Sequence, residues 1–71
     1  MTAAESVLRD DVLDHRCTRR HVAQSYALVM RSVHDADWPS INAAILDRYS
    51  LSGLEFIKRE AWKINDRLAG A

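Results

Sequence analysis

Hydrophobic side chains recur at alternating intervals of four and three residues through the first half of the chain. No glycine or proline interrupts this half between Thr2 and His34. The spacing is typical of an α-helix that buries one stripe of side chains. Thr2 followed three residues later by Glu5 matches a capping box, which marks a helix start. We therefore predict a long helix over residues 3–34. Its stripe consists of Leu8, Val12, His15, Arg19, Val22, Tyr26, Val29 and Val33.

The middle of this segment is polar, since residues 14–21 contain no large hydrophobic side chain. Two interpretations follow. The helix continues through a polar waist, or it stops and Thr18 caps a second helix after a short break. We favour the continuous helix because the segment contains no helix breaker.

A shorter helix is predicted next, over residues 38–48. Asp37 is a suitable N-cap, and Pro39 fits the first helical turn, where its missing N–H costs nothing. Residues 49–53 are predicted to form a tight connection that ends this helix.

The last helix is predicted to start near Gly53 and to end at Gly70. Ser52 and Glu55 match a second capping box, and the terminal glycine is a helix-stop signal. The apolar positions are again spaced by three and four residues. They are Leu54, Ile57, Ala61, Ile64 and Leu68.

Composition supports one all-α domain covering residues 1–71. Hydrophobic residues make up 48% of the 71 residues, which argues against intrinsic disorder, and two glycines and one proline supply few turns for a sheet. The predicted fold is a long N-terminal helix followed by an antiparallel hairpin of two shorter helices. No apolar run approaches the length of a membrane span. A single cysteine, Cys17, cannot form an internal disulfide, so we expect a cytoplasmic location.

The long helix also predicts self-association. Residues 38–68 are too few to cover a helix of about 48 Å, and monomers avoid exposed apolar patches. We therefore expect a homodimer through one face of that helix. The residues of this face are Val22, Tyr26, Val29 and Val33.

The candidate chemistry is sparse. Cys17 and His21 lie four residues apart on one helix face, but residues 38–71 offer no histidine or cysteine to complete a zinc site. No glycine-rich loop or well-placed acid accompanies the Cys17–His21 pair. The sequence therefore predicts no metal, no cofactor and no enzymatic activity.

Charge is balanced overall but uneven along the chain. Ten basic residues offset ten acidic ones, which removes the excess expected of a dedicated DNA-binding domain. Residues 1–14 carry a net charge of −3 (four acids, one base), whereas residues 15–34 carry +4 (four bases, no acid). The basic part is therefore expected to meet an acidic surface.

Residues 41–64 also fit the outline of a helix-turn-helix unit, with basic residues along its second helix. However, the first turn of that helix, residues 53–56, lacks arginine, asparagine and glutamine, which read base edges in the major groove. DNA binding is therefore the alternative function.

The preferred function is that of a small non-enzymatic protein-interaction module. Such modules act as adaptors, inhibitors or regulators of larger proteins, and phages and mobile elements encode proteins of this size. Two surfaces compete as the binding region, and we favour the waist because arginine is enriched at interfaces. The waist comprises Arg16, Arg19, Arg20 and His21, and the outer face of the last helix comprises Phe56, Arg59 and Lys63.

Overall fold

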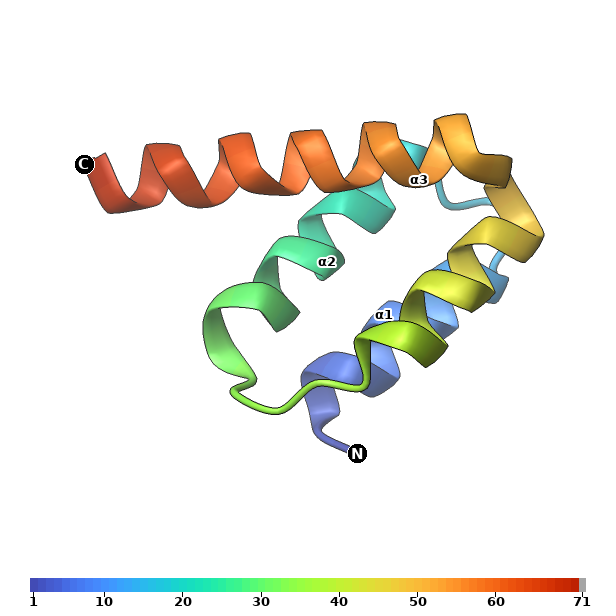
Figure 1. Cartoon of the computed structure of the whole chain (residues 1–71), viewed down its shortest axis with the longest axis horizontal. Helices are drawn as coiled ribbons and strands as arrows, with labels where there is room; N and C mark the ends of the chain where they lie inside the picture. Colours follow the sequence, from blue (N-terminus) through green and yellow to red (C-terminus); the bar gives the residue numbers. More distant parts are fainter. Residues whose placement is uncertain (71) are drawn as a thin grey trace.

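The computed structural model describes residues 1–70, which form three α-helices (Figure 1). The predicted all-α class is confirmed, and no strand occurs within these residues. The long helix, however, is the C-terminal one rather than the N-terminal one. The helices are α1 (Ala3–Leu13), α2 (Arg19–Ser32) and α3 (Trp38–Gly70).

The predicted continuous helix over residues 3–34 is wrong, because the chain leaves the helix at residues 14–18. The Asp14 carboxylate accepts a hydrogen bond from the backbone N–H of Arg16 at 2.9 Å. Thr18 then caps α2 by accepting from the backbone N–H of His21 at 3.1 Å. Short polar side chains offer the backbone these alternatives to a helix, and no large apolar side chain in residues 14–18 supplies packing energy to oppose them. The alternative interpretation, with a break before Thr18, is therefore confirmed.

Because of this break, α1 and α2 both pack into one core. Leu8 from α1 and Val22 and Val29 from α2 are fully buried. Tyr26 is only 4% exposed, and its hydroxyl donates to Asn42 Oδ1 of α3 at 2.9 Å.

The predicted homodimer face is therefore not an uncovered surface. Its first three residues, Val22, Tyr26 and Val29, lie in the core of their own chain, and Val33 is half-buried at the C-cap of α2. The argument for a dimer through this face assumed that no other part of the chain covers it. In the structure, α3 supplies the cover.

The helix α3 begins at Trp38 with Pro39 in its first turn, as predicted, and kinks at Ser50. Ser50 has φ 65° and ψ 179°, a backbone conformation that residues with a side chain rarely adopt. The chain turns back at this kink, so α3 consists of two helical segments (Figure 1). The predicted connection over residues 49–53 is wrong in extent, because only Ser50 departs from helical geometry.

The second segment of α3 buries the predicted stripe along only part of its length. Leu54, Ile57 and Ala61 are buried, whereas Leu68 is 56% exposed. Figure 1 shows the last turns projecting beyond the other helices. Within residues 1–70, no helix has the length and apolar character needed to cross a membrane.

Glu5 joins the start of α1 to the start of α3. Its carboxylate accepts hydrogen bonds from the backbone N–H of Thr2 at 3.1 Å and from that of Asp37 at 3.4 Å. The capping box predicted for Thr2 and Glu5 is thus confirmed. These hydrogen bonds, that of Thr2 foremost, hold the pKa of Glu5 below its ordinary value of 4.5.

This lowered pKa makes stability depend on pH. The contribution of the ionised Glu5 is complete above pH 4.5, its ordinary pKa, and is lost as the pH falls through the lower value of the folded state. We expect the free energy of unfolding to decline in that window, and we expect Glu5→Gln to remove part of the decline. Urea unfolding at a series of acidic pH values measures both. An unchanged pH dependence in Glu5→Gln would contradict this assignment.

Candidate functional site

A basic groove of about 460 Å³ lies between α2 and the second segment of α3. We call it the arginine groove, because three of its six lining side chains are arginines and only one is a carboxylate. Arginine presents five N–H donors in a planar fork, which suits bidentate binding of carboxylate or phosphate groups. The lining residues are Arg20, Gln24, Arg31, Glu60, Ile64 and Arg67.

Hydrogen bonds fix the two walls of the arginine groove relative to each other. Arg31 Nη1 of α2 donates to Asn65 Oδ1 of α3 at 3.1 Å. The Asn65 amide nitrogen in turn donates to the Ala27 carbonyl at 3.1 Å. These contacts hold the Arg31 guanidinium at the junction of the two helices.

The single carboxylate in the groove, that of Glu60, forms no ion pair with Arg20 or Arg67. Glu60 Oε2 lies 3.3 Å from Lys63 Nζ, which is the neighbouring cation on the same helix. Arg20 and Arg67 are exposed and form no ion pair within residues 1–70. Their guanidinium groups are therefore available to an external anion.

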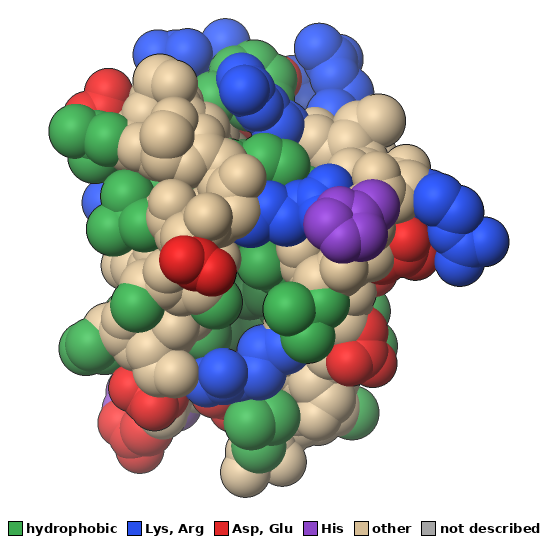
Figure 2. All heavy atoms as spheres, turned by 90° about the vertical axis from the view of Figure 1, so that its right-hand side faces the viewer, with side chains coloured by type: hydrophobic (Ala, Val, Ile, Leu, Met, Phe, Trp, Pro, Cys, Tyr) green, Lys and Arg blue, Asp and Glu red, His purple; other side chains and the backbone are tan. Residues whose placement is uncertain are grey.

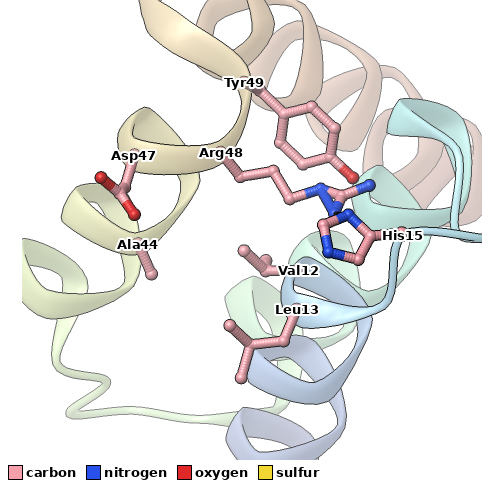
Figure 3. Close-up of a pocket in the computed structure, with 7 residues that line it drawn as sticks. All are labelled: Val12, Leu13, His15, Ala44, Asp47, Arg48 and Tyr49. Carbon is pink, nitrogen blue, oxygen red and sulfur yellow. Dashed lines mark hydrogen bonds between the residues drawn. The ribbon is translucent and has the colours of Figure 1, made fainter.

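A second hollow, the kink groove, lies between the end of α1 and the kink of α3. Its volume is about 540 Å³. Figure 2 faces this end of the molecule and shows hydrophobic side chains in the hollow beneath basic and histidine side chains. The lining residues, drawn in Figure 3, are Val12, Leu13, His15, Ala44, Asp47, Arg48 and Tyr49.

The cation of the kink groove is already engaged by its neighbours. Arg48 Nη1 lies 2.9 Å from His15 Nδ1 (Figure 3), and its guanidinium carbon lies 4.9 Å from the centre of the Tyr49 ring. The Tyr49 hydroxyl donates to the Cys17 carbonyl at 3.4 Å, which ties the loop after α1 to the kink. These contacts connect the loop after α1 to the kink of α3.

The structure separates the four residues of the predicted waist. Arg16, 92% exposed at its side chain, pairs with Asp14 through contacts of 3.2 and 3.3 Å and lowers the pKa of that carboxyl. Arg19 extends over the kink of α3, where it approaches Gly53. Arg20 lines the arginine groove, whereas His21 turns toward α1.

The other predicted surface, the outer face of the last helix, is partly reassigned. Phe56 is half-buried against the core, so less of its ring is free to contact a partner than predicted. Arg59 is exposed, and Lys63 pairs with Glu60 at the edge of the arginine groove. The waist and the outer face therefore meet this groove through one side chain each, Arg20 and Lys63.

A third group of side chains, the Asp11 cluster, contains a residue that the sequence did not indicate, because only the Cys17–His21 pair was noted there. It contains Asp11 of α1, Cys17 of the loop and His21 of α2, whose nearest donor atoms all lie within 4.8 Å of one another. Cys17 Sγ is 3.9 Å from Asp11 Oδ1, and His21 Nε2 is 3.5 Å from Asp11 Oδ2. Ser25 donates a further hydrogen bond to the Asp11 carboxylate.

The Asp11 cluster does not have the geometry of a catalytic triad. In a triad the imidazole lies between the nucleophile and the carboxylate, whereas here the Asp11 carboxylate contacts both Cys17 and His21. Burial, with the nearby carboxylates of Asp14 and Asp11, raises the pKa of the Cys17 thiol. A thiol with a raised pKa is a poor nucleophile near neutral pH.

The helix-turn-helix alternative meets an obstacle at the start of its second helix. Gly53 and Leu54 are buried, and Leu51 is 60% exposed. The exposed polar side chains of this turn are Ser52 and Glu55, and a carboxylate repels the phosphates of DNA. The turn therefore offers little for base recognition.

Comparison of the chain with protein families, with curated proteins and with solved structures finds no match. Its function must therefore be inferred from the surfaces described above.

Proposed function

We propose that this chain is a small protein-interaction module that binds an acidic segment of a larger protein in the arginine groove. One observation carries the proposal. Arg20, Arg31 and Arg67, which come from two different helices, line one groove whose only carboxylate is engaged by Lys63. Burial of these guanidinium groups against carboxylates would supply both affinity and orientation.

The walls of the groove favour a protein segment over a free ion. Ile64 is half-buried in the groove between the basic side chains, so an apolar side chain flanked by acidic residues would complement it. The Gln24 amide can both donate and accept hydrogen bonds along a bound backbone. An adaptor, inhibitor or regulator needs no more than such a surface.

The experiment that tests this function is capture of the partner by the full chain. The chain is immobilised and exposed to a nuclease-treated extract of the organism that encodes it, at physiological salt. We expect retention of a protein with an acidic surface, which elutes as the salt concentration rises, because exposed charge pairs are screened. Retention of DNA instead, in an untreated extract, would favour the helix-turn-helix alternative over residues 41–64.

A further inference from the structure

We propose that the Asp11 cluster binds one zinc ion through Asp11, Cys17 and His21. The proposal is independent of the arginine groove and of the partner bound there. It rests on three donor atoms of different chemistry that the fold brings together from α1, from the following loop and from the first turn of α2.

Each of the three donor types is one that zinc accepts in proteins. A cysteine sulfur, a histidine nitrogen and a carboxylate oxygen are its usual protein ligands, whereas calcium and magnesium require oxygen. The thiolate and the carboxylate together would balance the charge of Zn²⁺. When the metal binds, the Cys17 thiol releases its proton to solvent and the sulfur becomes the ligand.

The donor atoms lie near one another but are more widely spaced than in a closed tetrahedral site. With metal–ligand bonds of about 2.0–2.3 Å, neighbouring ligand atoms lie roughly 3.3–3.7 Å apart. Cys17 Sγ lies 3.9 Å from Asp11 Oδ1, and His21 Nε2 lies 3.5 Å from Asp11 Oδ2, while one donor atom from each of the three residues lies within 4.8 Å of the other two. On binding, rotations of these side chains would bring the three atoms closer together around the ion.

The surroundings match a site with one open position. The hydrogen bond from Ser25 orients the Asp11 carboxylate, as hydrogen bonds to metal ligands commonly do. The His21 side chain is 53% exposed, so water can reach the fourth coordination position. Arg16, the cation next to Cys17 in sequence, is directed to Asp14.

A zinc ion here would link the two helices across the break at residues 14–18. In this segment the sequence supplies no large apolar side chain, and Cys17 alone packs against the core. Metal binding would therefore stabilise the junction of α1 and α2 in addition to their contacts in the hydrophobic core.

Cobalt substitution followed by optical spectroscopy tests the site on the full chain. We expect one Co²⁺ per chain, a thiolate-to-cobalt charge-transfer band, and loss of this band when Zn²⁺ is added. Cys17→Ser should abolish the band. Asp11→Asn and His21→Gln should weaken cobalt binding by at least about 100-fold, because changes to residues that merely support a ligand already cost about 10- to 100-fold.

The matched control is His34→Gln, which removes an exposed histidine outside the cluster and should leave the affinity unchanged. Far-ultraviolet circular dichroism verifies that each variant folds. His21→Gln retains the backbone N–H that Thr18 caps, so its helix start is preserved. Absence of the charge-transfer band in the wild type, one metal per two chains, or equal affinity of His21→Gln and His34→Gln would overturn the proposal.

Discussion

Gly53→Ala is expected to lower the free energy of unfolding by about 1–3 kcal/mol, the usual cost of forcing extra volume into a packed site. A Cβ atom at this position would overlap Cβ of Tyr49, on the other side of the kink at Ser50. Because the Tyr49 Cβ is attached to the backbone, side-chain rotation cannot relieve the clash. The kink itself would have to open.

The sign of the change in the free energy of unfolding shows whether close packing or helix propensity dominates at Gly53. In an open helix, replacing glycine with alanine stabilises by about 1 kcal/mol. Gly70→Ala is the control, because an added Cβ there meets no atom within 4 Å, and it should change stability by no more than about 0.5 kcal/mol. Urea unfolding followed by circular dichroism measures both. A stabilised Gly53→Ala variant would show that the kink does not bring Tyr49 and residue 53 together.

Ile57→Ala is expected to cost about 2–5 kcal/mol, the range for deleting a large aliphatic side chain from a core. Ile57 is fully buried, and its segment of α3 packs against α2. Leu68→Ala, on the same predicted stripe, should cost less than about 0.5 kcal/mol because Leu68 is 56% exposed.

The comparison of these two variants measures how far the core extends along α3. Each is unfolded in urea at the same pH, and the slope of the transition is compared with that of the wild type. Similar losses from Ile57→Ala and Leu68→Ala would mean that the last turns of α3 are covered, contrary to the structure.

Local signals in the sequence predicted the starts of α1 and α3, because caps act over three or four residues, whereas the capping box predicted for Ser52 and Glu55 is not formed within residues 1–70, where the second segment of α3 is already helical at Leu51. Thr2 with Glu5 and Pro39 after Asp37 mark starts that the structure confirms. The break at residues 14–18 was harder to predict. The apolar spacing continues in step across it, so the stripes of two helices resemble one.

The tertiary arrangement could not be read from local spacing. The groups of the arginine groove lie 47 residues apart at their extremes, Arg20 and Arg67, and meet only because α3 turns back at Ser50. Adjacent residues of the predicted waist diverge because they lie in the first turn of a helix, where successive side chains point in different directions. Asp11 joins Cys17 and His21 only after α1 and α2 fold against each other.

The affinity of charge-reversal variants for the captured partner tests the proposed binding surface most directly. Arg20→Glu combined with Arg67→Glu reverses two cations in the arginine groove. The outer-face pair, Lys58→Glu combined with Arg59→Glu, makes the same charge change on exposed residues of α3 that do not line the groove. We expect the groove pair to weaken binding about 10- to 100-fold in titration calorimetry, and the outer-face pair to stay within about threefold of the wild type. Melting temperatures verify that both variants fold. Equal affinities of the groove pair and the wild type would contradict the proposed function.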